Sequence, residues 1–294
     1  MNVAVNNVAV NFGILASKRT ILDVPVCDLD WDSALAFSND LVNLTNGQTI
    51  IAFLNAHNAN LMLKFEDYHE LLQSQLVFPD GFGVDIASTV LHGEAFPANL
   101  NGTDFIPALM TYMKDGKRIG LIGAKPEVLG AARQEFQRRC PWHTFIAVSD
   151  GYLDDEKSKR VIEEIETLSL DVLIVCMGTP RQERWVAHYI RPGHARLVMT
   201  GGALFDFISG TVPRASETLR RLRLEWAFRF WNEPRRLAGR YLVGIPQFFF
   251  NLMRFRFRKR ALPSYLERGA TVEAGGGPQV GRLHTAPTRT TVAR

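Results

Sequence analysis

The sequence predicts a doubly wound α/β fold, Rossmann-like, with a mainly parallel sheet and a C-terminal helical basic appendage. Two observations support this prediction. Short apolar runs alternate with longer helical patterns over about 200 residues, as expected where helices cover both faces of a parallel sheet. After Gly210 the character changes, and Arg, Phe, Trp and Leu become frequent. We therefore expect an N-terminal extension (1–20), an α/β domain (21–213), a helical appendage (214–260) and a disordered tail (261–294).

Seven runs are predicted as strands, and several of them are continuously apolar. A parallel strand that is covered on both faces has no polar side, so its sequence need not alternate. In chain order the predicted strands are Ile21–Val26, Thr49–Leu54, Gln75–Pro79, Arg118–Gly123, Thr144–Ser149, Asp171–Met177 and Arg196–Gly201.

Helical patterns lie between several of these strands. Two of them begin with Pro126 and Pro180, each just after a strand and a glycine, where a first-turn proline is tolerated. Beyond Gly210, two further helices are separated by Glu233 and Pro234, and the tail is rich in Gly, Thr, Pro and Arg. The predicted helices are Asn58–Ser74, Pro126–Arg139, Asp154–Leu168, Pro180–Ile190, Glu217–Trp231 and Arg235–Arg260.

The composition of the 294 residues is that of a globular protein. Hydrophobic residues make up 46% and charged residues 22%, which excludes disorder for most of the length. Cys27, Cys140 and Cys176 lie far apart, which excludes a disulfide framework and a cysteine zinc site and suits a reducing compartment. We expect no secretory signal and no membrane span, because the N-terminus lacks a positive region before its apolar stretch and no apolar run reaches ~18–20 residues.

Charge is distributed unevenly along the chain. Residues 1–213 hold 17 basic and 25 acidic side chains, a net of −8, whereas residues 214–260 hold 13 basic and 3 acidic ones, a net of +10. This asymmetry indicates an anionic partner. The aromatic content of the appendage favours an anionic membrane surface, and we expect no nucleic acid as a partner. The alternative is a solvated basic helix whose arginine stems pack on core aromatics.

Five loops that are polar or rich in glycine follow predicted strands. In an open α/β sheet the ligand lies beyond the carboxyl ends of the strands, so we expect one nucleotide-sized site there. The loop ending at Gly123 is the best local candidate for a phosphate, although it can also be only a tight turn. It carries neither the GxGxxG fingerprint nor a P-loop, which argues against a dinucleotide oxidoreductase and a P-loop NTPase. The loops are 55–58, 79–83, 123–125, 178–183 and 201–203.

Individual polar side chains near these loops are candidates for chemistry. Asp80 could be a general base, although Pro-Asp-Gly is also an ordinary turn. Asp104 could bind a sugar hydroxyl, but Asn101 could equally cap the following helix, and the cap is the favoured interpretation. The amide of Gln182 could contact a sugar or a uracil edge, or lie exposed at the start of its helix.

Several motifs occur together, and in the same order, in one family of enzymes. They are PDGFGV, NGTDF, VCMGTPRQERW, GGALFDFISGTVPRA and LEWAFRFWNEPRRLAGRY. Over roughly residues 20–255 the chain resembles the WecG/TagA/CpsF glycosyltransferases, which form glycosyltransferase family 26 and build bacterial surface polysaccharides. The combination of motifs is far more specific than any one of them.

The resemblance implies an inverting, metal-independent transfer of a hexose from a UDP-sugar donor. The hexose would be glucose, N-acetylmannosamine or its uronic acid, and the acceptor a sugar on a polyprenyl diphosphate, in surface polysaccharide or exopolysaccharide assembly. No cofactor is implied, and arginines and helix dipoles would replace a metal. The enzyme would sit peripherally at the cytoplasmic face of the bacterial inner membrane, and a homo-oligomer is left open.

The family pattern also implies roles for particular residues. Asp80 matches the proposed base, Gln182 the glutamine that contacts the donor, and Asn55 the asparagine of a T-x-N-x-E/H segment. Phe53 stands where relatives with known donor sites carry threonine, which affects donor identity more than reaction type. The expected catalytic residues are Asp80, Arg214, Arg229 and Arg236, and the expected substrate-binding residues are Asn55, Asn101, Asp104, Gly123, Gln182, Gly201 and Gly202.

Two other classes of function stay open at this point. A nucleotide-sugar-modifying enzyme, an epimerase or an oxidoreductase, would share the α/β fold, but it should show GxGxxG with an acidic residue about 20 residues further on. A non-catalytic membrane-surface adaptor would explain the basic appendage, but not the polar loops around Asp80 and Gln182.

Overall fold

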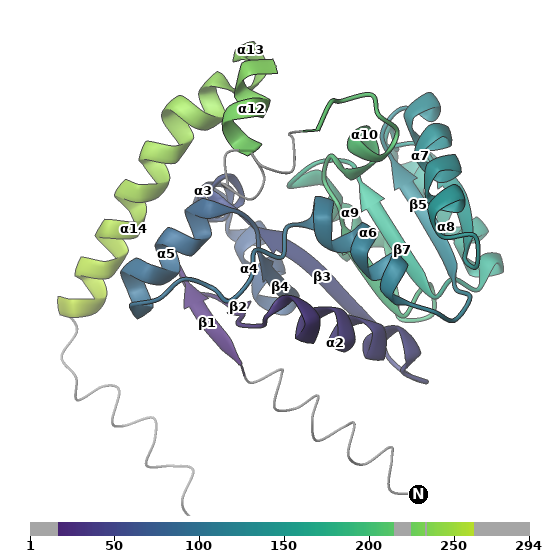
Figure 1. Cartoon of the computed structure of the whole chain (residues 1–294), viewed down its shortest axis with the longest axis horizontal. Coiled ribbons are helices and arrows are strands. Elements are labelled where there is room, and N and C mark those ends of the chain that lie inside the picture. Colours follow the sequence, from purple (N-terminus) through teal and green to yellow (C-terminus); the bar gives the residue numbers. More distant parts are fainter. Residues whose placement is uncertain (1–16, 215–224, 233, 262–294) are drawn as a thin grey trace, which may run out of the picture. The chain divides into compact units, whose positions relative to one another are not determined.

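The computed structural model describes residues 17–214, 225–232 and 234–261 (Figure 1). The chain divides into two compact units, residues 1–255 and residues 256–294. Every contact discussed below belongs to the first unit. The tail predicted after residue 261 lies outside the described residues, as does most of the predicted extension (1–20).

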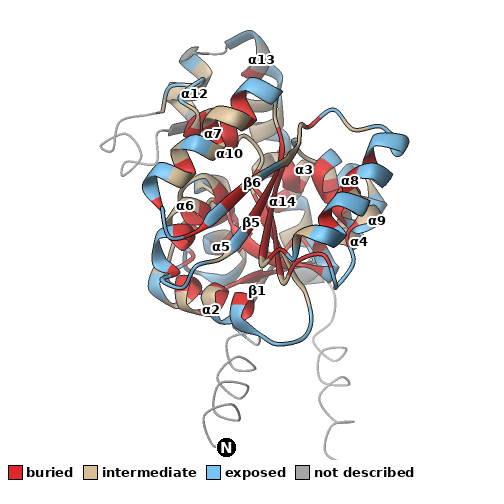
Figure 2. Ribbon diagram, turned by 90° about the vertical axis from the view of Figure 1, so that its right-hand side faces the viewer, coloured by how far each residue is buried: buried red, intermediate tan, exposed pale blue. Residues whose placement is uncertain are grey.

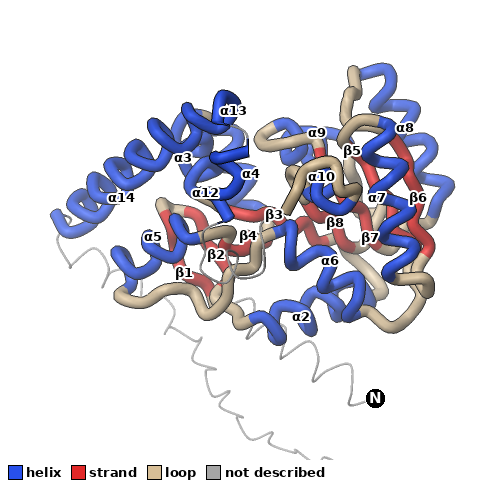
Figure 3. The backbone as a smooth tube through the Cα atoms, turned by 45° about the horizontal axis from the view of Figure 1, so that its top comes forward, coloured by secondary structure: helices blue, strands red, loops and turns tan. Residues whose placement is uncertain are grey.

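A mainly parallel sheet of eight strands is formed by the described residues (Figure 3). The strand order is β1-β2-β4-β3-β8-β7-β5-β6, and only the β1–β2 pair is antiparallel. The strands are β1 (Lys18–Ile21), β2 (Val24–Cys27), β3 (Thr49–Leu54), β4 (Leu76–Pro79), β5 (Arg118–Gly123), β6 (Thr144–Ser149), β7 (Val172–Cys176) and β8 (Leu197–Thr200).

Helices cover both faces of this sheet, so the predicted doubly wound α/β fold is confirmed. The helices before the C-terminal region are α2 (Trp31–Asn43), α3 (Ala56–Lys64), α4 (Glu66–Ser74), α5 (Phe82–His92), α6 (Gly102–Tyr112), α7 (Pro126–Arg139), α8 (Asp155–Leu168), α9 (Arg181–Tyr189) and α10 (Leu204–Ile208). One core cluster joins the sheet to α2, α6, α7 and α10. Two others join its opposite face to α3, α4 and α5, and to α8 and α9.

Alternation along the strands explains the two buried faces. In β3, Ile51 and Phe53 enter the first core cluster, whereas Ala52 and Leu54 enter the second. Successive side chains of a strand point to opposite faces, so a strand covered on both sides is apolar throughout. Figure 2 shows the result, with buried strands between helices whose outer surfaces are exposed.

The predicted strand Ile21–Val26 is wrong, because the chain turns within it. Leu22 and Asp23 both have positive φ values, 50° and 67°, which is the conformation of a two-residue hairpin turn. Ile21 and Val24 therefore pair across the turn, as neighbours in β1 and β2. β1 begins at Lys18, inside the predicted extension.

The predicted helix Asn58–Ser74 is likewise two helices. Phe65, with φ −123° and ψ 108°, is extended and separates α3 from α4. α3 begins at Ala56 because Asn55 caps it through its side chain. Helix α6 is the helix expected after Asn101, whereas helices α2, α5 and α10 were not predicted. The other predicted strands and helices of the α/β domain agree with the structure within about two residues.

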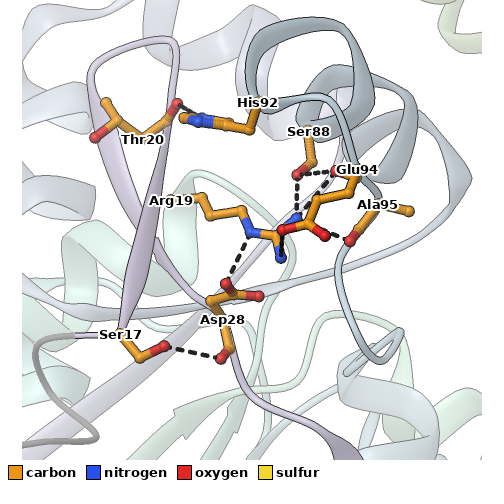
Figure 4. A network of polar contacts seen from close by, with 8 residues as sticks. All are labelled: Ser17, Arg19, Thr20, Asp28, Ser88, His92, Glu94 and Ala95. Atoms are coloured by element: carbon orange, nitrogen blue, oxygen red, sulfur yellow. Dashed lines mark hydrogen bonds and ion pairs between the residues drawn. The ribbon is translucent and has the colours of Figure 1, made fainter.

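Arg19 holds the edge hairpin to the rest of the sheet (Figure 4). Its Nε donates to Asp28 Oδ2 at 2.8 Å, and its Nη1 donates to Ser88 Oγ and to the carbonyl oxygens of Glu94 and Ala95. The Arg19 side chain is only 11% exposed. One guanidinium group thus joins β1 to the segment at the end of α5.

The C-terminal region is helical where the structure describes it. The elements are α12 (Glu225–Asn232), α13 (Pro234–Ala238), the π-helix η1 (Gly239–Val243) and α14 (Gly244–Ala261). Phe248 and Leu252 of α14 are buried in the core cluster that also holds α3 and α5, and Asn60 donates to the Gly244 carbonyl at 2.6 Å. Residues 217–224 of the predicted helix Glu217–Trp231 lie outside the described residues. In the described part of the chain, no helix has the length and apolar character of a membrane span.

Candidate active site

A pocket of ≈770 Å³ lies at the carboxyl ends of four neighbouring strands, β4, β3, β8 and β7. The loops after these strands bring Asp80, Asn55, Gly201 and Gly178 to its wall. This is the edge of an open α/β sheet at which ligands bind. Four of the five predicted loops therefore meet at one pocket.

Asn55 and Asp80 are directly connected in this pocket. The Asn55 Nδ2 group donates to Asp80 Oδ2 at 2.9 Å. The Asn55 Oδ1 atom accepts from the backbone N–H groups of His57 and Asn58, both at 3.0 Å. An amide side chain can donate at one end and accept at the other. The cap of α3 therefore fixes the orientation in which Asn55 holds the carboxylate.

The backbone around Asp80 is held by two further hydrogen bonds. The Asp80 N–H donates to the Leu54 carbonyl at 2.8 Å, and the Gly81 N–H donates to Asn99 Oδ1 at 2.8 Å. Gly81 has φ +88°, a conformation that favours glycine. The Pro-Asp-Gly segment is thus both a turn and the support of a carboxylate on the pocket wall.

Asn101 and Asp104 line the same pocket, and the predicted cap is present. Asn101 Oδ1 accepts from the Asp104 N–H at 3.0 Å at the start of α6, and Asn101 Nδ2 donates to Asp104 Oδ2 at 3.0 Å. Arg214 Nη2 donates to Asp104 Oδ1 at 2.5 Å and to Thr103 Oγ1 at 3.4 Å. The structure therefore places Arg214 against two pocket-lining side chains.

Gln182 lines the pocket but is only 2% exposed. Its Oε1 atom accepts from the N–H groups of Gly178 at 3.2 Å and Gly202 at 3.1 Å. Its Nε2 atom donates to Glu183 Oε1 at 2.8 Å. The amide thus ties the loop after β7 to the loop after β8. Its predicted contact with the donor stays a prediction.

The three predicted glycines differ in their positions. Gly201 and Gly202 line the pocket, and a Cβ atom on Gly201 would lie 2.8 Å from Cys176 Sγ, so any larger residue there would force Cys176 to shift. Gly123 is outside the pocket lining and packs against the backbone of Cys176. The loop of the fifth strand, β5, is therefore not brought together with the others.

The structure describes the side chains of some C-terminal arginines but not of others. Arg229 lies in α12 and Arg236 in α13, but their side chains are outside the described part of the structure. Arg240 and Tyr241 of η1 line the pocket instead. Burial and the charge of Arg240 lower the pKa of His57 to about 4, so this histidine is neutral at pH 7.

One side of the pocket is apolar. Phe82 and Ile86 of α5 and Ile245 and Phe249 of α14 line it. Phe53 also reaches the wall, and its ring would lie 3.1 Å from a Cβ atom placed on Gly102. The pocket therefore offers polar groups at the strand ends and apolar groups between α5 and α14.

Sequence reasoning missed several pocket residues. Asn99 was missed because its role depends on a backbone N–H that is 18 positions earlier in the chain. Glu183 follows Gln182 in a recognised motif, which was the available signal. Arg240 and Tyr241 lie among many basic and aromatic residues of the appendage, and nothing in the sequence distinguishes them. Among the described residues, no group of three or more His, Cys, Asp or Glu side chains is arranged to hold a metal ion.

Comparison with known proteins gives two findings. A family model described as "Glycosyl transferase WecG/TagA/CpsF family" matches residues 19–262. An N-acetylglucosaminyldiphosphoundecaprenol N-acetyl-beta-D-mannosaminyltransferase of Bacillus subtilis (strain 168) is 29% identical over 214 residues, which cover 72% of this chain and 81% of the relative. The residues matched by the family model include all four strand-end loops that line the pocket and the C-terminal helices through α14.

Proposed function

Since the chain belongs to the WecG/TagA/CpsF family of glycosyl transferases, we propose that it transfers a hexose from a UDP-sugar to a polyprenyl-diphosphate-linked sugar. The product would enter bacterial surface polysaccharide or exopolysaccharide assembly. The name of the Bacillus subtilis relative supports this proposal, because it specifies an N-acetylmannosaminyl group and a diphosphoundecaprenol acceptor. The hexose would be N-acetylmannosamine, its uronic acid or glucose.

The observation that carries the proposal is the Asp80 carboxylate, held by Asn55 at the wall of the pocket. In the proposed reaction, Asp80 accepts the proton of the acceptor hydroxyl. The hydroxyl oxygen forms a bond to the anomeric carbon of the donor, and the bond from that carbon to the diphosphate oxygen breaks. A single displacement of this kind inverts the configuration at the anomeric carbon.

UDP leaves with additional negative charge, which cationic groups must stabilise when no metal takes part. Arg240 lines the pocket, and Arg214 is placed against Asp104 and Thr103 at its edge. Helices α3 and α6 also begin at the pocket wall, and the dipole at a helix N-terminus favours an anion. Arg229 and Arg236 remain candidates for the same role.

The lipid-linked acceptor implies work at a bilayer surface, and we place the enzyme at the cytoplasmic face of the inner membrane. Helix α14 supports this placement. Its Phe250 side chain is 68% exposed and its Met253 side chain 40% exposed, and Arg254 beside them is also exposed. Exposed aromatic and basic groups together suit the headgroup region of an anionic membrane.

The proposal is tested by donor screening with a short synthetic lipid-diphosphate sugar as acceptor. Thermal shifts with a panel of UDP-sugars, run beside NAD(P), first identify the nucleotide that binds. Transfer is then measured by mass spectrometry, and NMR of the product gives its anomeric configuration. We expect transfer from one UDP-sugar with inversion in the presence of EDTA. Stabilisation by NAD(P) alone, with no transfer from any UDP-sugar, would contradict the proposal.

A further inference from the structure

A buried set of hydrogen bonds joins Glu183 to two loops of the pocket. Glu183 and Gln182 are 1% and 2% exposed. Glu183 Oε1 accepts from Gln182 Nε2 at 2.8 Å, and Gln182 Oε1 accepts from the N–H groups of Gly178 and Gly202. Because Glu183 presents an acceptor to Gln182, the amide must turn its own oxygen toward the two glycines.

The surroundings of the second carboxyl oxygen of Glu183 indicate whether this carboxyl group is protonated. Oε1 also accepts from Thr179 Oγ1 at 3.0 Å, but Oε2 is buried and has no hydrogen-bond partner among the described residues. The Tyr68 hydroxyl of α4 is also buried without a hydrogen-bond partner among the described residues, and burial raises the pKa of Tyr68. A buried carboxylate oxygen without a donor is costly while it carries charge, and protonation removes that charge.

No cation of the described residues is paired with Glu183, and the nearby charge of Arg184 is the one that acts on its pKa. Arg184, its neighbour in α9, forms an ion pair with Asp67 of α4, with Nε and Oδ2 2.6 Å apart. In the described residues no Lys, Arg or His side chain forms an ion pair with Glu183. Burial raises the pKa of Glu183 above its ordinary value of 4.5.

The other elements packed around α9 also determine which charged groups lie near Glu183. Helix α8 places Asp155 against the Tyr189 hydroxyl rather than against Glu183. On the pocket side, the lining holds the titratable or charged side chains of Asp80, Asp104, His57, Arg240 and Tyr241, and His57 is neutral at pH 7.

We propose that Glu183 is a neutral carboxylic acid that positions the loops after β7 and β8 through Gln182. Glu183 is a positioning residue, since it holds these two loops in place and does not touch the reacting groups. The connection between these loops and sugar transfer rests on the proposed function. The hydrogen bonds of Glu183 and Gln182 do not depend on it.

The protonation is tested by thermal unfolding between pH 5 and pH 8, with E183Q beside the native protein. Glutamine keeps an acceptor oxygen for Gln182 and Thr179 and carries an NH₂ group in place of the second oxygen, but it cannot ionise. Native stability contributed by neutral Glu183 is complete below pH 4.5 and is lost as pH rises through the raised pKa, because the unfolded carboxyl group binds fewer protons. The melting temperature of E183Q should therefore rise relative to the native one as pH increases.

The control variant is E163Q, which removes an exposed carboxylate of α8 and should follow the native curve. If E183Q is destabilised more at pH 8 than at pH 5, Glu183 is an ionised carboxylate and the proposal is wrong.

The positioning is tested by hydrogen exchange of the peptides that contain Gly178 and Gly202. In E183A both should exchange at least about tenfold faster than in the native protein, while peptides of β5 and β6 stay unchanged. In E183Q both should stay protected. If E183A does not fold, E183D replaces it, because its carboxyl group lies one methylene short of Gln182. Native protection of both glycines in a folded E183A or E183D would overturn the proposal.

UDP affinity, measured by calorimetry, separates this proposal from the proposed function. We expect UDP to bind E183Q within about twofold of the native affinity and E183A at least about tenfold more weakly. If native protein binds no UDP, the proposed function fails, while the exchange and pH experiments still decide the role of Glu183.

Discussion

Asn55 and Asp80 come from the ends of adjacent parallel strands, and one hydrogen bond of 2.9 Å joins the amide of the first to the carboxylate of the second. The same Asn55 caps α3 with its oxygen. A helix terminus thereby determines how the carboxylate is presented to the pocket. The two functions of Asn55 can be separated by substitution.

The variant N55D should keep the cap and lose the support of Asp80. Aspartate still accepts from the N–H groups at the start of α3, but it presents a second carboxylate to Asp80, which disfavours the ionised base. We expect kcat to fall by roughly 10-fold to 100-fold and the acidic limb of its pH profile to move to higher pH. An unchanged pH profile with unchanged kcat would show that the hydrogen bond has no part in catalysis.

The variant D80N should lower kcat by roughly 10²–10⁴-fold, the usual worth of a general base. The asparagine is isosteric, so donor affinity and the melting temperature should change little. Initial rates and calorimetry with UDP provide both measurements. D115N, at an exposed aspartate, is the control and should be fully active. Near-native turnover of D80N would remove Asp80 from the role of base.

The variant Q182A should weaken UDP binding by about 1–3 kcal/mol, because the N–H groups of Gly178 and Gly202 lose their acceptor. Calorimetry measures the change. Q134A, at an exposed glutamine of α7, should bind UDP like the native protein. Unchanged affinity in folded Q182A would mean that the tie between the two loops is irrelevant to the donor.

The variant R19A should destabilise the fold by about 2–4 kcal/mol without a direct effect on donor affinity. The nearly buried guanidinium group bonds to Asp28, Ser88 and two carbonyl oxygens, and its removal takes the donor away from Asp28 Oδ2 and from the Ala95 carbonyl oxygen. Urea unfolding followed by circular dichroism measures the loss. R138A removes an exposed ion pair with Glu135 and should cost no more than about 1 kcal/mol. An equal effect of the two substitutions would contradict the structural role given to Arg19.

Charge reversal at Arg256 and Arg258 should weaken binding to anionic vesicles by at least about tenfold at low salt. Each basic residue near an anionic surface contributes about 1 kcal/mol, and salt screens the attraction. Co-sedimentation at low and high salt measures the binding, and activity on a water-soluble acceptor should persist. K157E/K159E reverses two exposed charges on α8 and should bind vesicles as the native protein does. Equal binding to anionic and neutral vesicles would contradict the proposed electrostatic attachment to the membrane.

The sequence predicted those features that depend on short-range patterns. The continuous apolar runs of β3, β5 and β7 predicted parallel strands that are buried on both faces. The turn at Leu22 and Asp23 was missed because no glycine marks its positive φ values. The break at Phe65 was missed because its residues fit a helical pattern on both sides.

The candidate site was predicted less completely than the fold. Strand ends placed Asn55, Asp80 and Gln182 at one edge, and the pocket contains all three. Gly123 is not in the lining of this pocket, since it ends β5, which lies beyond β7 in the sheet, and its contact with the substrate stays a prediction. The acceptors that Gln182 and Asn99 offer to distant backbone N–H groups depend on tertiary contacts, which no local pattern specifies.

The pairing of β8 with both β3 and β7 has a consequence for biosynthesis. Ribosomal translation delivers β3 early, but β8 emerges only after about two-thirds of the chain. Until then the apolar strands β3 and β7 each expose an open edge, to which another nascent chain can pair. Insertion of β8 closes both edges in one step, and it also adds Thr200 to the pocket wall. A nascent chain released before β8 would therefore be both inactive and prone to aggregate.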